Sequence, residues 1–178
     1  MKIGIAGVGG IGSNVALNLV RSGVPRLKIV DFDRVERSNL NRQFYFADQI
    51  GLYKVEALAA NLTRIRPGLT IEALAKRIDP ANCTRLFADC DLIVEGFDGQ
   101  ADKKMLFEIF ADSRTVVSAC GIAGCNLATI RSRRIGNGYI VGDFSTDCEQ
   151  APLFCHKVST VANHMSEFIL CQPGVLHG

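Results

Sequence analysis

Short apolar runs alternate with helix-like segments along the first 120 residues of the chain. The runs are rich in Ile, Val and Leu and too short for helices, which is typical of the buried strands of a parallel sheet. Between them, apolar side chains recur at helical spacing, as at Val55, Leu58, Leu62 and Ile65. We therefore predict strands at 2–6, 27–30, 69–73, 92–94 and 115–119, and helices at 13–21, 54–65 and 100–111, with a further short helix from Asp79-Pro80.

The pattern changes after Gly124. Residues 127–135 and 139–141 flank the turn-forming Gly136-Asn137-Gly138, which predicts a β-hairpin, and a last helix is expected over 157–170. Together these elements predict an α/β fold, a doubly wound, mostly parallel, Rossmann-like sheet with a C-terminal β-hairpin extension and a final helix. We expect the 178 residues to form a single domain, with a core over 1–120 and the hairpin and last helix over 121–178.

A glycine-rich turn joins the first predicted strand to the first helix. Gly7, Gly9, Gly10 and Gly12 permit a sharp turn and a close approach of the backbone to a ligand. The free N–H groups and the dipole of a helix N-terminus favour an anion there. A purely structural turn is the alternative, but strand, turn and helix follow in the order of a nucleotide-binding βαβ unit. We therefore expect the core over 1–120 to bind a nucleotide.

Polar side chains fill the segment after the second strand. Asp31 ends that strand, where doubly wound folds place the acid that accepts hydrogen bonds from ribose hydroxyls. Arg42 and Lys54 supply fixed positive charge suited to a triphosphate. Lys54 lies at a predicted helix start, where the dipole disfavours a cation, and this favours a functional role. Asn39 and Gln43 can orient phosphate or ribose, with simple turn chemistry as their alternative.

A further acid, Asp98, follows the fourth predicted strand at the same edge of the sheet. Mg²⁺ is a hard ion that binds one or two carboxylates together with phosphates and water, so we expect Mg²⁺ at Asp98. Fixed charges that strengthen their contacts in a transition state lower the barrier, which makes Arg42, Lys54 and Asp98 the catalytic candidates. Asp33 is expected to organise its loop, and Asp102 to be a solvated helix residue.

Five motifs in the first 120 residues resemble the ATP-dependent adenylyltransferases that activate ubiquitin-like proteins, the ThiF/MoeB/ubiquitin-activating-enzyme superfamily. The chain looks most like the compact ThiF-type sulfur carrier protein adenylyltransferases of thiamine biosynthesis. The five motifs are Gly7-x-Gly9-Gly10-x-Gly12, Asp31-Phe32-Asp33, Ser38-Asn39-Leu40-x-Arg42-Gln43, Gly51-x-x-Lys54-Val55-Glu56 and Asp98. The combination of the second motif with the third is the most specific.

The resemblance implies a reaction. With ATP and Mg²⁺, the C-terminal glycine carboxylate of a ubiquitin-like sulfur carrier (ThiS-like) would become an acyl-adenylate, and pyrophosphate would be released. Asp31 and Asn39 would hold the nucleoside, Arg42 and Lys54 the phosphates, and Asp98 the metal. No catalytic base is required, because a carboxylate is already ionised at neutral pH. The family also implies a homodimer.

The chain departs from the family pattern in several places. Gly99 follows Asp98 where an asparagine is common, and no Cys-x-x-Cys pair is present, so we predict no zinc. The family's helical segment before the first strand, which can supply an arginine to a partner's ATP, is not seen before Lys2. Some relatives use a loop cysteine to form a covalent link with the carrier, for which Cys148 and, less so, Cys155 are candidates.

Three alternatives remain open at this point. The same chemistry can act on another acceptor, such as a carboxylate on a modified tRNA base. A non-catalytic nucleotide-binding or carrier-docking module would bind ATP without turnover. An NAD-dependent oxidoreductase has only the glycine turn in its favour and leaves Arg42 and Lys54 without a role.

Composition narrows the classes further. The net charge of +2 does not favour nucleic acid, and the chain holds no apolar stretch of membrane-spanning length. We expect a cytoplasmic protein with reduced thiols. Cys83, Cys90, Cys120 and Cys171 are expected to be small buried side chains. We expect structural or surface roles for His156, His164 and His177, and a solvated hairpin or an acidic carrier protein as the environment of Arg131, Arg133 and Arg134.

Overall fold

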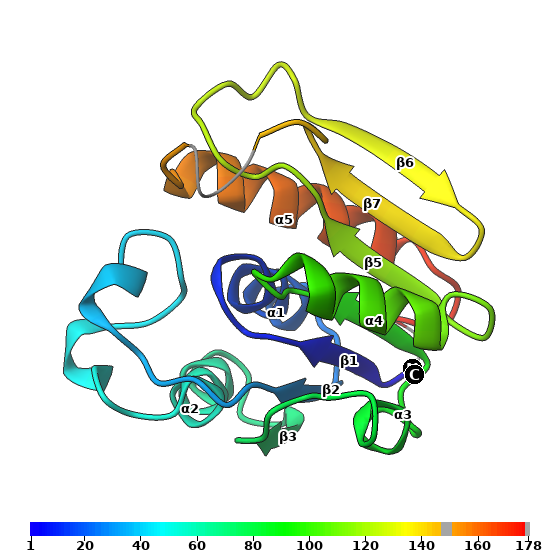
Figure 1. The fold of residues 1–178 in the computed structure, drawn as a ribbon. Coiled ribbons are helices and arrows are strands. Elements are labelled where there is room, and N and C mark those ends of the chain that lie inside the picture. The colour runs from blue at the N-terminus through cyan, green and yellow to red at the C-terminus, as the bar shows by residue number, and fades with distance from the viewer. Residues whose placement is uncertain (147–150, 177–178) are drawn as a thin grey trace.

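Seven strands form one sheet in the order β3-β2-β1-β4-β5-β7-β6 (Figure 1). Residues 1–146 and 151–176 are those that this computed structural model describes. Neighbouring strands run parallel except for β6, which pairs antiparallel with β7. The strands are β1 (Ile3–Ala6), β2 (Arg26–Val30), β3 (Thr70–Leu74), β4 (Leu92–Glu95), β5 (Thr115–Ala119), β6 (Arg131–Ile135) and β7 (Gly138–Gly142).

Helices cover both faces of this sheet, which explains the nearly continuous apolar character of its central strands. One core lies beneath α1, α2 and α5, and a second lies beneath α3 and α4. α1 packs closely along α5, as Figure 1 shows. The helices are α1 (Gly10–Arg21), α2 (Lys54–Ile65), α3 (Cys83–Leu86), α4 (Gln100–Phe110) and α5 (Cys155–Leu170).

The chain changes direction across the sheet between β1 and β4. From β1 it proceeds outward to β2 and β3, and then it returns to the other side of β1 to form β4. The connections that leave β1 and β4 therefore diverge, and this opens a crevice at the carboxyl ends of the strands. The glycine-rich turn, Asp31 and the segment with Asp98 all follow strands at that edge.

The predicted fold class is confirmed, and several element boundaries differ. β6 begins at Arg131 rather than at 127, because the Asn126 side chain accepts a hydrogen bond from Ala128 N–H (2.9 Å) and bends the chain. The short helix predicted from Asp79 begins at Cys83. The Asp79 carboxylate instead accepts hydrogen bonds from the N–H groups of Ala81 and Asn82, which stabilises a turn ahead of the helix.

Two of the four cysteines expected to be buried are exposed. Cys83 and Cys90 are buried as predicted, and desolvation raises the pKa of each thiol to about 11. The prediction is wrong for Cys120, which lies just beyond the end of β5, and for Cys171, which caps the C-terminus of α5. Each lies one residue beyond its element, Cys120 after the buried Ala119 and Cys171 after the half-buried Leu170.

No helix among the described residues is long and apolar enough to cross a membrane.

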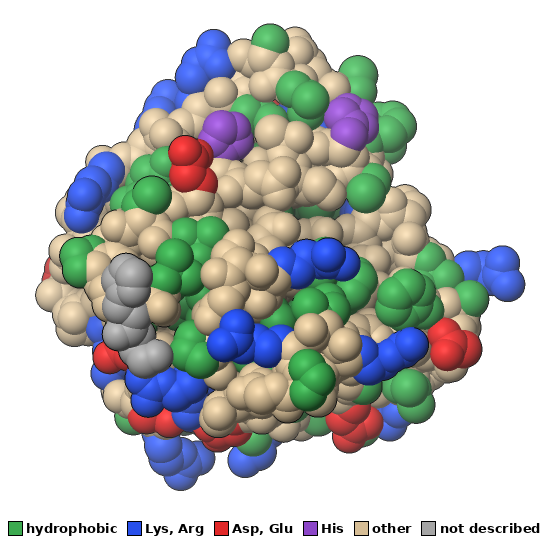
Figure 2. Space-filling model, turned by 180° about the vertical axis from the view of Figure 1, so that it is seen from behind, with side chains coloured by type: hydrophobic (Ala, Val, Ile, Leu, Met, Phe, Trp, Pro, Cys, Tyr) green, Lys and Arg blue, Asp and Glu red, His purple; other side chains and the backbone are tan. Residues whose placement is uncertain are grey.

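The edge strand β6 carries the three arginines of the hairpin. All five of its residues are exposed. The Arg133 guanidinium lies 4.3 Å from the centre of the Phe144 ring, and that of Arg134 lies 5.9 Å from the centre of Phe168. Lys and Arg side chains on the face shown in Figure 2 are interspersed with acidic and hydrophobic ones. The three arginines are thus exposed, and their contact with an acidic carrier protein stays a prediction.

Candidate functional site

The glycine-rich turn brings the backbones of two loops into direct contact. Gly7 has a positive φ of 84°, and a Cβ there would lie 2.9 Å from the Gly96 carbonyl oxygen. A Cβ on Gly12 would clash with the carbonyl oxygen of Gly7. α1 begins at Gly10, and no side chain caps its N-terminus. The backbone is therefore close to the crevice and presents helix N–H groups to an anion.

Asp31 holds this turn in place. Its carboxylate, which is buried, accepts hydrogen bonds from Val8 N–H (2.7 Å) and from Asp33 N–H (2.8 Å). Desolvation raises the pKa of Asp31 above its ordinary value, against the opposing effects of these two hydrogen bonds and of the Lys54 charge. Each carboxylate oxygen has a second lone pair, so Asp31 can accept a further hydrogen bond from a ligand.

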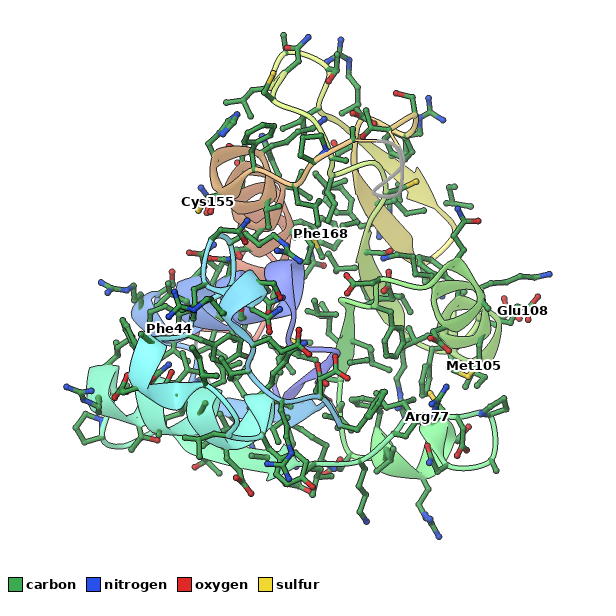
Figure 3. The ribbon with its side chains drawn as sticks, turned by 60° about the vertical axis from the view of Figure 1, so that its left-hand side comes forward. Phe44, Arg77, Met105, Glu108, Cys155 and Phe168 are labelled. Carbon is green, nitrogen blue, oxygen red and sulfur yellow. The ribbon has the colours of Figure 1, made fainter. Side chains whose placement is uncertain are left out.

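A cavity of about 180 Å³ opens beside Asp31. Its apolar wall comes from Val30, Ile78 and Phe97, and its rim from Phe32 and Arg77, whose guanidinium lies 5.3 Å from the centre of the Phe32 ring. Figure 3 shows Arg77 on the segment that follows β3, well away from Cys155 on α5. Sequence reasoning missed the 76–78 segment and Phe97. Their position after parallel strands at the same edge was the available signal.

A second, polar cavity of about 200 Å³ adjoins the first and shares Asp33, Lys54 and Asp98 with it. Five of the predicted site residues therefore meet at one place: Asn39, Arg42, Gln43, Lys54 and Asp98. One end of the combined site has an apolar wall, and the other is lined entirely by polar side chains of both charges. That division matches a nucleotide, which has an aromatic base at one end and phosphates at the other.

Both predicted cations are positioned by the protein itself. Lys54 is the first residue of α2 and is buried, with its Nζ 2.9 Å from the Asp33 carboxylate and its backbone N–H bonded to the Asp33 carbonyl (2.9 Å). Asp33 thus organises its loop, as predicted, and also orients Lys54. The Arg42 guanidinium donates to the Ser38 carbonyl (2.9 Å) and to the Asn41 side chain (2.8 Å). Its partners are neutral, so its charge is uncompensated by them.

The two amides of the polar loop have different surroundings. Asn39, at the end of the 3-10 helix η1 (Arg37–Asn39), accepts a hydrogen bond from Glu36 N–H (3.0 Å) and so closes that turn. Gln43 is buried, 7% exposed, and its Oε1 has no hydrogen-bond partner among the described residues. Buried polar atoms are normally paired. Gln43 is therefore the amide that is available to a ligand, while Asn39 is partly committed to the turn.

The loop that carries Arg42 and Gln43 is tied to α1 and to the glycine-rich turn. Asn14 Nδ2 donates to the Arg42 carbonyl (2.8 Å), and the Ser13 hydroxyl accepts from Phe44 N–H (3.1 Å). The buried Tyr45 hydroxyl donates to the Val8 carbonyl (2.7 Å). Desolvation, with smaller effects of Asp31 and Asp33, raises the pKa of Tyr45 well above its ordinary value, so the phenol remains a donor. These contacts were not predicted from the sequence.

The remaining candidates lie elsewhere or outside the described residues. Cys155 is exposed at the start of α5, with its Sγ 3.7 Å from the Ser159 hydroxyl. His156 is exposed and contacts the Cys125 carbonyl (2.9 Å). Asp102 is exposed and lines the first cavity, so it is a solvated helix residue at the rim of the site. Cys148 and His177 lie outside the described residues. Within those residues, no three His, Cys, Asp or Glu side chains are grouped closely enough to hold a metal.

Comparison with solved structures shows that this architecture is shared. The tRNA N6-threonylcarbamoyladenosine dehydratase TcdA of E. coli, in complex with AMP, superposes with a TM-score of 0.84, covering 95% of this chain and 86% of that one at 18% identity. E. coli MccB with ATP superposes with a TM-score of 0.76, covering 95% and 55% at 18% identity. At such identities the likeness establishes the fold alone.

Sequence comparison identifies the family. Ubiquitin-like modifier-activating enzyme 5 of Culex quinquefasciatus is 31% identical over 178 residues, which cover 98% of this chain and 44% of that protein. The Bombyx mori enzyme is 42% identical over 94 residues, 53% of this chain and 23% of the relative. The chain thus spans less than half the length of these relatives. The ThiF family model matches residues 1–134, and the chain therefore belongs to the ThiF family.

Proposed function

We propose that this chain is an ATP- and Mg²⁺-dependent adenylyltransferase that activates the C-terminal glycine carboxylate of a ubiquitin-like sulfur carrier protein. The observation that carries the proposal is the pair of adjoining cavities, one with an apolar wall and one lined by polar side chains that include Arg42 and Lys54, with Asp33, Lys54 and Asp98 shared between them. The relatives named as activating enzymes of ubiquitin-like modifiers support the choice of acceptor.

The nucleoside would occupy the first cavity, with its base against the apolar wall. Val30, Ile78 and Phe97 would face the base, and Asp31 would accept a hydrogen bond from a ribose hydroxyl. The glycine-rich turn and the N-terminus of α1 would approach the α-phosphate through backbone N–H groups. Asn39 would support this arrangement mainly through the turn that it closes.

The phosphates would occupy the polar cavity. In the reaction a carboxylate oxygen of the acceptor attacks the α-phosphorus, the bond to the bridging oxygen breaks, and pyrophosphate leaves with the electron pair. Negative charge therefore increases on the leaving group, where Arg42 and Lys54 can stabilise it. Lys54 already has Asp33 as a partner, so a phosphate must share or replace that contact. The unpaired Gln43 Oε1 can only accept, so it would bond to a donor such as a ribose hydroxyl, and Gln43 Nε2 is the group that could donate to a phosphate oxygen.

Asp98 is the residue that would hold Mg²⁺, since it lines both cavities and offers the oxygen ligands that this ion prefers. When bound, Mg²⁺ would neutralise phosphate charge. The chain's own residues contribute positioning and fixed charge, and no general base is needed for an ionised acceptor.

Two alternative functions remain, one with another acceptor and one without catalysis. Adenylylation of a carboxylate on a tRNA base would use the same residues, and the shared fold of the dehydratase TcdA keeps this alternative in view. A carrier-docking module would bind ATP without forming an adenylate. The proposal also includes a role in the thiamine pathway, a homodimeric assembly and a single-domain organisation. It further includes a cytoplasmic location and the absence of zinc. The family resemblance and the composition support these parts.

The test is exchange of labelled pyrophosphate into ATP in the presence of a carrier that ends in Gly-Gly. We expect exchange to require the carrier. In Asp98→Ala it should fall about 100- to 1000-fold, since an electrostatic contact in the transition state is lost. Asp112→Ala, an exposed acid beyond the end of α4, is the matched control and should retain activity. ATP binding without carrier-dependent exchange would contradict the proposal and favour the docking module or another acceptor.

A further inference from the structure

A buried carboxylate lies directly beneath the segment that carries Asp98. Glu95 is the last residue of β4, and it is fully buried, with 0% of its surface exposed. An unpaired ionised carboxylate at such a depth is costly, so its partners identify what it holds in place. The family motifs do not include this residue, and the proposed reaction gives it no direct contact with a substrate.

Three elements converge on the Glu95 carboxylate. Its Oε1 accepts hydrogen bonds from Phe97 N–H (2.6 Å) and from the Lys103 ammonium of α4 (3.0 Å). Its Oε2 accepts from Lys103 (2.9 Å) and from the Ser118 hydroxyl of β5. Lys103 also donates to the Ala119 carbonyl (3.3 Å) at the end of β5. The ends of β4 and β5 and the first turns of α4 are thereby joined through one carboxylate.

The same segment is fixed from its other side by the glycine-rich turn. A Cβ on Gly96 would lie 2.6 Å from the Gly7 carbonyl oxygen and 3.2 Å from Gly12 N. Gly96 thus packs against the turn, while Phe97 N–H is bonded to Glu95. Between these two constraints and the start of α4 at Gln100, the residues that line the first cavity are Phe97, Asp98 and Gly99, and Asp98 is the one with a carboxylate.

We propose that Glu95, through its pair with Lys103, is a positioning residue that sets the Asp98 carboxylate for the metal-bound phosphates of ATP. The inference rests on the proposed function and adds residues to it. Groups that orient a metal ligand typically change metal affinity by about 10- to 100-fold when they are removed. Loss of the pair therefore weakens the use of Mg²⁺ more than it weakens binding of the nucleotide alone.

The test compares two charge-neutral double variants of α4 and its surroundings. Glu95→Gln with Lys103→Met removes the buried pair without leaving a lone charge. Lys104→Met with Glu108→Gln removes the solvent-exposed pair of the same helix, in which the ammonium and carboxylate lie 3.6 Å apart and Glu108 points away from the fold (Figure 3). The measurements are the Mg²⁺ concentration for half-maximal exchange, and Mn²⁺ affinity with a non-hydrolysable ATP analogue by electron paramagnetic resonance.

We expect the Glu95/Lys103 variant to raise both metal constants about tenfold or more, and the Lys104/Glu108 variant to leave them within twofold. ATP binding in the presence of a chelator should change by less than threefold in both. A purely structural role would lower the melting temperature and the maximal rate, and it would leave the half-saturating metal concentration unchanged; that outcome overturns the proposal. Lys103→Arg keeps the charge and should restore metal use to within threefold of the wild type.

Two further measurements keep the inference testable if the double variant does not fold or the wild type lacks exchange activity. Ser118→Ala removes a single hydrogen bond to the same carboxylate and should raise both metal constants about two- to threefold, and unchanged constants would again overturn the proposal. The Mn²⁺ measurement needs no acceptor, so it tests Glu95 even if the proposed reaction fails in the wild type.

Discussion

Two regions of the sheet use charged side chains in different ways. Beneath α3, Lys2 contacts Glu72 (2.7 Å) and Asp89 (2.5 Å), and Lys28 in the middle of β2 contacts Asp89 (2.6 Å) and the Leu86 carbonyl (3.0 Å). The four charges form a closed network. At the edge where the strands end, Arg42 has only neutral partners, the Gln43 oxygen has none among the described residues, and Asp31 is buried with a raised pKa.

The difference shows which polar groups lack a protein partner and can therefore bind a ligand. In the closed network the basic and acidic groups satisfy one another, and hydrogen bonds from Lys2 and Lys28 hold the pKa of Asp89 below its ordinary range. At the strand ends Lys54 is paired with Asp33, but Arg42 and Gln43 retain charge and hydrogen-bonding capacity that can serve a nucleotide. Stability is expected to depend on the closed network and activity on the strand ends.

The largest expected effect is at Lys54. Lys54→Met should reduce carrier-dependent exchange by about 100- to 1000-fold, because a fixed charge on the leaving phosphates is lost. Its ion pair is with Asp33, whose side chain is 48% exposed, so the melting temperature should change by only about 2 °C. Exchange rate and thermal unfolding are measured on the same preparation. Lys104→Met, at an exposed site, is the control, and a large drop in its exchange rate would remove the contrast between the two regions.

Gln43 and Gln49 differ in whether the oxygen of the side-chain amide has a hydrogen-bond partner. Gln43→Ala should weaken ATP binding about tenfold, since one buried hydrogen bond to the ligand is lost, and should leave the melting temperature nearly unchanged. Gln49, in the 3-10 helix η2 (Ala47–Gln49), donates to the buried Asn61 side chain (2.7 Å) and accepts from Phe46 N–H (3.0 Å).

Gln49→Ala should therefore destabilise the fold by about 1 to 2 kcal/mol and change ATP affinity by less than twofold. Isothermal titration with ATP and thermal unfolding measure the two effects. Equal losses of affinity in the two variants would mean that Gln43 does not contact the nucleotide.

The smallest expected effect is at Asp89 and depends on pH. Its folded-state pKa is depressed, mainly by the hydrogen bonds from Lys2 and Lys28, so its contribution to stability is complete above the unfolded pKa of about 4 and is lost as the pH falls through the folded pKa. Half of its side chain is exposed, which limits the contribution to about 0.5 to 1 kcal/mol, or about 1 to 4 °C.

Asp89→Asn should therefore melt below the wild type at pH 7, with a gap that narrows as the pH falls below 4, while exchange activity is retained. Calorimetry across this pH range measures the gap. A constant gap would show that the charge of Asp89 does not stabilise the network.

Much of the fold was predictable because its signals are local. Apolar runs of strand length, helical spacing and the glycines at Gly7 and Gly136 depend on neighbours in the sequence, and each led to the right element type. Boundaries were less predictable where a side chain bonds to nearby backbone, as Asn126 and Asp79 do. Burial of cysteine was mispredicted at Cys120 and Cys171, since the end of an element decides exposure and composition does not.

The residues of the candidate site likewise divide into those with a local sequence signal and those without one. The glycine-rich turn, Asp31, Arg42, Gln43, Lys54 and Asp98 were identified from motif spacing, and the structure brings them to two adjoining cavities. Arg77, Phe97 and Glu95 were not identified. Each depends on contacts between segments that are distant in the sequence, such as Glu95 with Ser118 and Arg77 with Phe32.

By itself, the sequence determined the fold class, the family motifs and the residue types that can bind a triphosphate, since periodicity and spacing act over short distances along the chain. Only the tertiary structure decided which of those side chains are already committed to protein partners. Lys54 is paired with Asp33, Asn39 closes a turn, and Gln43 is left without a partner among the described residues. The physical reason is that hydrogen-bond satisfaction and desolvation depend on every atom around a group, and folding brings those atoms together from across the chain.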